Sequence, residues 1–261
     1  MMRQTAMGLL GLVIMVAPAA AAQCSSTGGG FGAWKKEFAG EAKAQGIGSR
    51  GLAALAATSY STGTIRVDRN QHFFKLSLDS FMAKRGAAGI IARGRKLKSA
   101  NAALFAKLEK RYGVPPGPLI AIWGMETGFG GSTGNQPTIS AVATLAYDCR
   151  RSDYFTDHLY AALKLVDRGV LSSSTRGAMH GEVGQTQFLP KNILLYGADG
   201  DGGGINLNGK ADALASTAKF LSREGWKSGG PYRASAFANW NAATVYQKAL
   251  AIMASKIDAG G

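Results

Sequence analysis

One acidic residue, Glu126, stands where a charged side chain is unexpected, directly after a short apolar segment at residues 119–125. Three prolines precede this segment and favour a helical first turn, and its composition predicts a helix that is buried on most sides. Burial disfavours the charged form of a carboxyl group, and the negative end of the helix dipole disfavours it again, so both raise the pKa. A carboxyl group that keeps its proton near neutral pH can act as a general acid. The alternative is a glutamate that only hydrogen-bonds a neighbouring loop.

No second carboxylate accompanies Glu126 in a comparable setting. Asp148, Asp153 and Glu182 could approach it in three dimensions, but their sequence contexts are typical of exposed or helix-capping residues. Most glycosidases place two carboxyl groups on either side of the bond that they cleave. A single acid instead favours a mechanism in which the substrate itself supplies the second nucleophile.

A polar segment at residues 184–190 combines Gln185, Thr186 and Gln187 with the aromatic Phe188. Two amides and a hydroxyl group beside an aromatic ring suit the hydroxyl and N-acetyl groups of sugars. Capping of a helix by polar side chains is the alternative.

A glycine-rich loop that starts at Asp199 resembles an EF-hand calcium loop, with Asp201 at its third position. The pattern is degraded, because Gly203 and Lys210 replace the acidic residues of positions 5 and 12, although Asp212 could act as a late ligand. Two interpretations are open: a calcium site formed by the three aspartates, or a loop whose glycines only provide positive φ.

Basic residues dominate the charge, which is +14 for the whole chain and +13 without Arg3. Such an excess favours an anionic partner, which could be a cell-wall polymer, lipid headgroups or nucleic acid. The densest basic stretch, residues 84–98, has no interleaved aromatic residues, which argues against nucleic acid. Arg150 and Arg151 form a pair that suits a carboxylate ligand, with solvated side chains at a helix end as the alternative.

The N-terminus has the features of a secretory signal peptide. Arg3 precedes an apolar run at residues 7–16, and small residues lead to a predicted cleavage site after Ala22. The apolar run is too short for a permanent membrane anchor, and no later segment is long and apolar enough to span a bilayer. We therefore expect an exported, periplasmic protein, and Gln23 argues against lipid anchoring at Cys24.

The chain has two cysteines, Cys24 and Cys149. Because export permits disulfides, we predict that they pair, with two unrelated thiols as the alternative. The bond would close a long loop and contribute about 4 kcal/mol on the chain-entropy model.

Apolar residues recur at helical spacing through most of the chain, so the fold class is mainly α. Strand signals such as alternation and β-branched runs are nearly absent. Residues 58–80 are polar and are predicted to be irregular. Helices are predicted near residues 31–42, 49–55, 89–98, 99–112, 119–125, 139–147, 152–168, 185–196, 211–224 and 241–256.

Taken together, these segments resemble the lytic murein transglycosylase B family, which has a lysozyme-like catalytic domain. The resemblance covers about residues 31–256. After the predicted signal peptide at residues 1–22, it implies a domain at residues 23–261, with an additional helical N-terminal region at residues 23–100 and a lysozyme-like α-helical core at residues 101–261. The matching segments are residues 112–116, 122–127, 143–148, 150–151, 184–190, 199–202 and 213–221.

The resemblance implies cleavage of the β-1,4 bond between N-acetylmuramic acid and N-acetylglucosamine in peptidoglycan, with no required cofactor. Glu126 matches the catalytic glutamate, which protonates the glycosidic oxygen and then takes the proton of the muramyl 6-hydroxyl to close a 1,6-anhydro ring. Gln187 and Asn241 match residues of the sugar site, and Arg150 and Arg151 match residues that contact the peptide stem. The loop with the three aspartates matches an EF-hand-like calcium loop.

The chain departs from the family at residues 178–180, Ala-Met-His, where relatives often carry Ser or Ala followed by Trp-Ala. It also has Trp240 where a tyrosine usually precedes the asparagine. These departures and the +13 charge leave a non-catalytic cell-wall-binding protein as one alternative. A lysozyme-type hydrolase with Asp148 or Glu182 as second carboxylate is the other. In each case we expect a monomer that binds peptidoglycan strands and no nucleic acid.

Overall fold

The structure is a computed structural model that describes residues 22–70, 76–227 and 232–260. Within these ranges the chain is mainly helical, as predicted, and its two strands, β1 (Gln136–Pro137) and β2 (Arg176–Gly177), pair antiparallel. Two short 3-10 helices cover Gly28–Gly30 and Ala234–Phe237. The α-helices are α1 (Phe31–Ala44), α2 (Ser49–Ala56), α3 (Thr62–Arg69), α4 (Leu78–Lys84), α5 (Ala87–Ala100), α6 (Ala102–Tyr112), α7 (Pro116–Thr127), α8 (Thr138–Tyr147), α9 (Ser152–Asp167), α10 (Pro190–Tyr196), α11 (Lys210–Arg223) and α12 (Thr244–Asp258).

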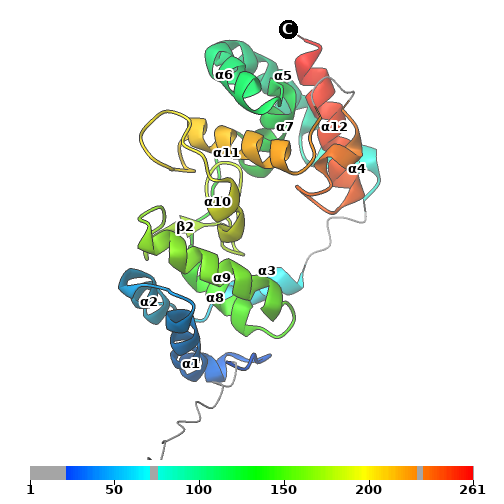
Figure 1. Ribbon diagram of the computed structural model, residues 1–261. Helices are drawn as coiled ribbons and strands as arrows, with labels where there is room; N and C mark the ends of the chain where they lie inside the picture. The colour runs from blue at the N-terminus through cyan, green and yellow to red at the C-terminus, as the bar shows by residue number, and fades with distance from the viewer. Residues whose placement is uncertain (1–21, 71–75, 228–231, 261) are drawn as a thin grey trace, which may run out of the picture.

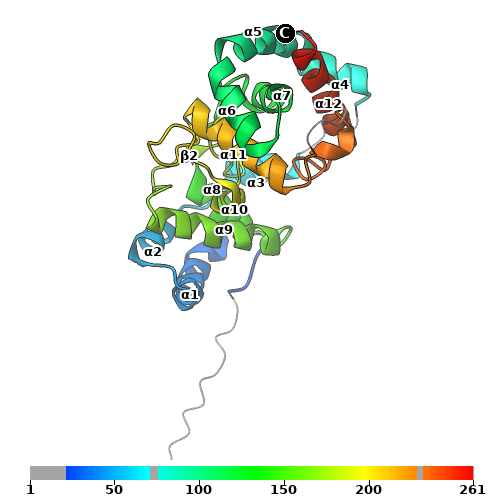
Figure 2. The same cartoon turned by 45° about the horizontal axis from the view of Figure 1, so that its top comes forward.

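The helix that carries Glu126, α7, is enclosed by other helices. Figure 2 shows α7 inside a ring formed by α5, α6, α11 and α12, and it packs against all four. Its residues from Gly117 to Met125 are all buried. This confirms the prediction of a helix that is buried on most sides, because apolar residues cover its whole circumference.

Different contacts fix the two ends of α7. At the N-terminal end, both carboxylate oxygens of Asp258 from α12 accept the backbone N–H of Gly117 at 3.0 Å, where the positive end of the helix dipole favours a negative charge. A side chain at position 117 would collide with α12, since a Cβ atom there would lie 2.4 Å from the carbonyl oxygen of Ala254. At the C-terminal end, Gly128 adopts a φ of 59°, so the chain turns directly after the helix.

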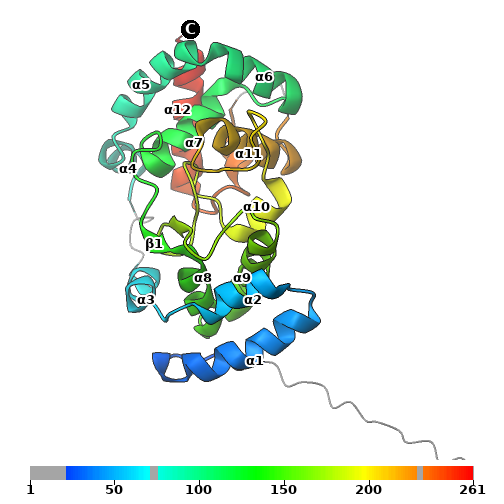
Figure 3. The same ribbon diagram turned by 90° about the vertical axis from the view of Figure 1, so that its left-hand side faces the viewer.

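A second group of helices, α1, α2, α3, α8 and α9, forms the opposite half of the molecule (Figure 1). Helix α9 packs against α8, α2 and α10, and α10 lies between the two halves. Helix α2 packs against α8 and α9, and α1 packs against α2 and lies below α8 and α9 in the view of Figure 3. Phe31, Trp34 and Phe38 form the buried face of α1 that their spacing predicts, and they contact Tyr147 and Tyr160.

The prediction that residues 58–80 are irregular is wrong, because they contain α3 and the first residues of α4. Both helices are short, and a serine side chain caps each one. Ser61 accepts the N–H of Thr64, and Ser77 accepts the N–H of Ser80. Such a cap stabilises a helix by about 1 kcal/mol. The polar composition of these residues gave no apolar pattern that predicts a helix. The positions of Ser61 and Ser77, which are typical of helix N-caps, could have indicated both helices.

The helix predicted at residues 185–196 is shorter in the structure and begins only at Pro190. The residues before it form a tight turn, which is closed by an antiparallel bridge between Val183 and Phe188. Two backbone hydrogen bonds join these two residues, at 2.9 and 3.0 Å. The turn replaces the predicted first helical turn and holds the polar segment in a fixed shape.

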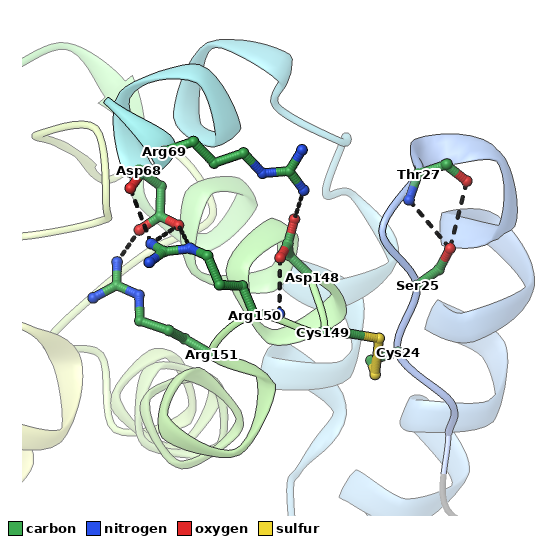
Figure 4. Close-up of polar contacts among 9 residues, drawn as sticks. All are labelled: Cys24, Ser25, Thr27, Asp68, Arg69, Asp148, Cys149, Arg150 and Arg151. Atoms are coloured by element: carbon green, nitrogen blue, oxygen red, sulfur yellow. Dashed lines mark hydrogen bonds and ion pairs between the residues drawn. A yellow bond between two sulfur atoms is a disulfide. The ribbon is translucent and has the colours of Figure 1, made fainter. Parts of the chain in front are cut away.

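The predicted disulfide between Cys24 and Cys149 is confirmed. It joins the segment before α1 to the connection between α8 and α9 (Figure 4). The backbone N–H of Ser25 also donates to the carbonyl of Tyr147 at 2.9 Å, so the N-terminal segment is attached both to the last residue of α8 and to the connection that follows it.

The sequence predicts a signal peptide and no membrane-spanning segment. The signal peptide predicted at residues 1–22 lies outside the described residues, apart from Ala22. Across the ranges that the structure describes, no helix combines the length and the apolar character needed to cross a membrane.

A buried histidine links α9 to α10 and makes stability dependent on pH. The Nδ1 atom of His158 accepts the backbone N–H of Lys191 at 3.1 Å. Burial and the nearby Lys191 ammonium group lower the pKa of His158 to about 4. Between pH 6.5 and pH 4 only the unfolded chain takes up this proton. We therefore expect the free energy of unfolding to fall as the pH decreases through this range, by about 3 kcal/mol at most.

Urea denaturation at pH 7, 5.5 and 4.5 measures this effect. The matched variant is His158→Asn, which keeps an acceptor near the Nδ1 position but has no group that titrates in this range. The free energy of unfolding should fall more for the wild type than for the variant as the pH decreases. A constant difference across the three pH values would contradict the prediction.

Candidate active site

Glu126 lies near the C-terminal end of α7, where the chain meets a cleft. Its Oε1 atom accepts two hydrogen bonds, from Nε1 of Trp240 at 3.0 Å and from the hydroxyl group of Tyr246 at 2.5 Å. Tyr246 is buried on α12, and Trp240 lies shortly before that helix. Within the described part of the chain, Oε2 receives no hydrogen bond. The two donors therefore fix the carboxyl group through one oxygen and leave the other for a ligand.

Burial raises the pKa of Glu126, as predicted. The hydrogen bonds from Tyr246 and Trp240 and the charge of Arg85 act in the opposite direction, but they do not cancel the effect of burial. Burial and the neighbouring Glu126 also raise the pKa of Tyr246, so its hydroxyl group keeps its proton and acts as the donor. A partly buried carboxyl group that retains its proton above the usual range can serve as a general acid.

The cleft beside Glu126 has a volume of about 310 Å³. It brings together three of the predicted site residues, Glu126, Gln187 and Asn241. Amide groups, carboxyl groups and aromatic rings share its walls, and a few polar groups among rings are typical of a ligand site. The other lining residues include Tyr154, Glu182, Phe220, Asn239 and Trp240.

Gln187 and Asn241 are held in the cleft by the backbone around them. Gln187 has a left-handed backbone with a φ of 58°, a conformation that costs a residue with a side chain about 1 kcal/mol. Its Nε2 atom donates to the carbonyl groups of Gly184 at 2.9 Å and Thr133 at 3.3 Å. The Oδ1 atom of Asn241 accepts the N–H of Ala243 at 2.9 Å. Strain at a residue that lines a cleft supports a role for Gln187 in binding.

Gln185 does not line the cleft, so its position does not support the predicted role in substrate binding. Its Oε1 atom accepts a hydrogen bond from Nε1 of Trp123 at 2.8 Å, and its Nε2 atom donates to the carbonyl of Asn208 at 2.6 Å. Its own carbonyl accepts the hydroxyl of Thr127 at 2.6 Å. Gln185 therefore connects the end of α7 to the residues before α11.

A second carboxylate, Glu182, lines the same cleft as Glu126. The backbone N–H of His180 donates to its Oε2 atom at 3.0 Å, and the Nδ1 atom of His180 lies 3.3 Å from its Oε1 atom. Burial alone would raise the pKa of Glu182, but the hydrogen bonds and charge of His180 outweigh it, and the pKa lies below its usual value. The prediction that Glu182 is exposed or capping is wrong, because 23% of its side chain is exposed and it faces the cleft.

The buried residue Asp68 on α3 connects His180 to the arginine pair. The Nε2 atom of His180 lies 3.5 Å from Oδ1 of Asp68. Asp68 also forms ion pairs with Arg150 and Arg151, and Nε of Arg150 donates to its Oδ2 atom at 2.7 Å (Figure 4). The arginines are thus more than solvated side chains at a helix end. The carboxylate that they bind here belongs to the protein, and 44% and 33% of their side chains stay exposed.

The other two candidate carboxylates do not line the cleft. Asp148 is buried, forms an ion pair with Arg69 at 2.6 Å and accepts the N–H of Arg150 at 3.0 Å (Figure 4). Asp153 is exposed in the first turn of α9. Asp148 is therefore a structural residue that holds α3 against the end of α8, and only Glu182 shares the cleft with Glu126.

The predicted calcium loop brings Asp199, Asp201 and Asp212 together. One carboxylate oxygen from each lies within 4.8 Å of the other two. Backbone N–H groups of the loop donate to both oxygens of Asp199 and to both oxygens of Asp212, so these two carboxylates are held in place. Gly202 and Gly204 adopt positive φ, which the glycine-rich interpretation requires as well. A cluster of carboxylate oxygens is the ligand type that calcium prefers, and the residues fit it.

Sequence reasoning missed Tyr246 and Asp68, and it noted Trp240 only as a departure from the family. Tyr246 belongs to a stripe of buried residues on α12, together with Leu250 and Met253. A hydroxyl group among buried apolar residues normally has a hydrogen-bond partner, so the position of Tyr246 in the sequence could have indicated a buried polar contact. Asp68 gave no signal, because its arginine partners lie about 80 residues further along the chain.

The fold and the candidate site together indicate a class of protein. An enclosed helix ends in a carboxyl group with a raised pKa, and this group lies beside a polar cleft. Residues 30–249 match the transglycosylase SLT domain, and the chain belongs to this family. Membrane-bound lytic murein transglycosylase B of Escherichia coli K12 is 35% identical over 121 residues, which are 45% of this chain and 34% of that relative. The match thus spans about a third of the relative's length.

Solved structures confirm the lysozyme-like fold of this family. SltB3 of Pseudomonas aeruginosa, in complex with NAG-anhNAM-pentapeptide, superposes with a TM-score of 0.71 at 32% identity, over 77% of this chain and 55% of that chain. Slt35 of Escherichia coli, in complex with calcium, has a TM-score of 0.76 at 18% identity, over 86% of this chain and 92% of that chain. At this lower identity the likeness concerns the fold alone.

Proposed function

We propose that the protein is a lytic transglycosylase that cleaves the β-1,4 bond between N-acetylmuramic acid and N-acetylglucosamine in peptidoglycan. The observation that carries this proposal is Glu126, a carboxyl group with a raised pKa that is fixed by two donors at the wall of a polar cleft. The family supports the reaction, and the peptidoglycan fragment in the SltB3 complex supports the substrate class.

In the proposed mechanism Glu126 acts twice. As an acid it gives its proton to the glycosidic oxygen while the bond from that oxygen to C1 of the muramyl sugar breaks. As a carboxylate it then takes the proton of the 6-hydroxyl group of the same sugar, whose oxygen attacks C1 and closes the 1,6-anhydro ring. Glu126 thereby regains its proton, and neither water nor a second nucleophile from the protein is consumed. The donors Trp240 and Tyr246 stabilise the carboxylate between the two steps.

The remaining site residues bind the polymer in this proposal. Gln187 and Asn241 contact the sugars at the cleaved bond, since both line the cleft with Glu126. The exposed parts of Arg150 and Arg151 contact a carboxylate of the peptide stem. Their other contacts hold Asp68, so their guanidinium groups are already oriented before the substrate binds.

Analysis of the products tests the proposal. Purified peptidoglycan is digested and the released fragments are identified by mass spectrometry, and 1,6-anhydromuramic acid ends are expected. The position of Glu182 favours one alternative, a lysozyme-type hydrolase, because an ionised carboxylate in the cleft could activate water. Reducing muramic acid ends would identify that hydrolase. Binding without any cleavage would identify a non-catalytic cell-wall-binding protein.

Within the transglycosylase proposal, Glu182→Gln is expected to lower the rate about tenfold or more while the anhydro ends persist, because the ionised carboxylate stabilises positive charge on the sugar in the transition state. The charge of Glu182 also raises the pKa of Glu126. Removal of that charge lowers the pKa, so the alkaline limb of the pH–rate profile should move to lower pH. The exposed Glu37 on α1 provides the matched control, Glu37→Gln. Identical profiles for the wild type and Glu182→Gln would contradict this role.

The proposed function includes a calcium site with a structural role and a periplasmic location. Asp199, Asp201 and Asp212 are the residues that would hold a calcium ion, which would fix the loop before α11, and no chemical step depends on it. We place the protein in the periplasm, where its substrate is found, on the basis of the predicted signal peptide.

A further inference from the structure

A second pocket shares no lining residue with the active-site cleft and has a volume of about 610 Å³. It lies between the C-terminal ends of α6 and α11 and the loop that follows α10. Helix α11 separates the two pockets, because Phe220 lines the cleft whereas its neighbour Lys219 lines the second pocket. The residues that line the second pocket are Arg111, Tyr112, residues 197–199, Lys219, Ser222 and Arg223.

The charges in this pocket are unbalanced. Arg111, Lys219 and Arg223 contribute three positive charges against the single negative charge of Asp199, which gives the lining a net charge of +2. Both oxygens of Asp199 are occupied by backbone N–H groups of its own loop. In the described ranges, none of the three basic side chains forms an ion pair. Burial and the charges of Arg223 and Arg111 lower the pKa of Lys219, so both guanidinium groups act unfavourably on its ammonium group.

One polar group at the pocket also lacks a hydrogen-bond partner within the described residues. The hydroxyl oxygen of Tyr112 is buried, and no group in the described residues hydrogen-bonds it. A buried hydroxyl group normally has a partner. Lys219 donates to the carbonyl of Gly197 at 3.2 Å, and Arg111 lies over the ring of Tyr112 at 5.1 Å. These contacts hold the basic groups at the pocket without neutralising their charge.

We propose that this pocket is a second ligand site, which binds an oxyanion of the carboxylate or phosphate class. Guanidinium groups bind such anions with paired hydrogen bonds, and an anionic ligand that enters here would offset the positive charge of Arg111, Lys219 and Arg223. The pocket is much larger than a single oxyanion, so the anion is carried by a larger molecule. The site is independent of the chemistry at Glu126.

Titration of the full chain, followed through backbone amide chemical shifts in the presence of EDTA, tests the proposal. The probes are N-acetyl-alanyl-alanine, its C-terminal amide and inorganic phosphate. Saturable shifts are expected at residues 111–112, 197–199 and 219–223, with either or both anions and not with the amide. The double variant Arg111→Gln/Arg223→Gln should bind at least about fivefold more weakly, because it loses two charge-assisted hydrogen-bond donors.

The matched control is the double variant Lys36→Gln/Lys43→Gln, which removes the same charge from exposed positions on α1. This control should bind as the wild type does, and thermal unfolding of both double variants verifies that they fold. Saturation by the peptide alone or by phosphate alone identifies the source of the oxyanion. Shifts that do not saturate, or equal weakening in both double variants, would overturn the proposal. Because the readout is binding, the outcome does not depend on whether the protein cleaves peptidoglycan.

Discussion

The variant Glu126→Gln is expected to release anhydro fragments from peptidoglycan about 10²- to 10⁴-fold more slowly than the wild type, with little change in KM. Glutamine can accept hydrogen bonds from Trp240 and Tyr246 as the carboxyl group does, so the site keeps its shape. It can neither give a proton to the glycosidic oxygen nor take one from the 6-hydroxyl group. Quantitative mass spectrometry of the digest measures the effect, and full lytic activity in this variant would contradict the assignment.

Stability measurements on the same variant separate a catalytic loss from a folding defect. A pKa that is raised in the native state means that the native chain holds this proton over a pH range in which the unfolded chain has lost it. The glutamate therefore destabilises the protein increasingly as the pH rises from about 4.3, the pKa of an unperturbed glutamate. We expect Glu126→Gln to gain stability relative to the wild type as the pH rises above about 4.3, while Glu37→Gln shows no such trend and keeps full activity.

The double variant Cys24→Ser/Cys149→Ser is expected to lose about 4 kcal/mol in free energy of unfolding. The disulfide joins residues that are 125 positions apart, and a loop of this length restricts the unfolded chain strongly. Urea denaturation without a reductant measures the difference from the wild type.

A thiol reductant provides the control for this prediction. It should reduce the stability of the wild type to that of the double variant, and it should leave the double variant unchanged. The ion pairs of Asp68 with Arg150 and Arg151 do not involve the disulfide and hold the residues after Cys149 in place, so activity under native conditions should be preserved. A loss of less than about 1 kcal/mol would show that the N-terminal segment contributes little to the folded state.

Much of the fold could be predicted because the pattern of apolar residues in the sequence indicates which sides of a helix are buried. The apolar circumference of α7 and the spacing of Phe31, Trp34 and Phe38 in α1 each indicated the right helix and the right buried face. Helices α3 and α4 could not be found in this way, since each is short and has few buried residues. Their stability depends on serine caps and on ion pairs such as that between Arg69 and Asp148, which periodicity does not record.

The candidate site was predictable where one residue is unusual in its own segment. Glu126 met this condition, because a carboxyl group at the end of an apolar helix conflicts with its surroundings. Glu182 did not, since its position in the cleft and its lowered pKa depend on His180 and on the chain of contacts that reaches Asp68 on α3. Gln185 is ambiguous in the sequence, because an amide that suits a sugar also suits Trp123, and only the three-dimensional structure shows that its oxygen accepts a hydrogen bond from Trp123.

The hydrogen bonds that fix Glu126 have a consequence for the order in which the protein becomes active. Trp240 and Tyr246 lie 114 and 120 residues after the carboxyl group that they hold. A ribosome completes α7 long before it completes α12, and the ring of helices around α7 cannot close in that interval. The acid therefore acquires its position and its raised pKa only when the C-terminal helix docks. A nascent or partly unfolded chain lacks the arrangement of Glu126 that the proposed function requires, so we expect the proposed activity only in molecules that have finished folding.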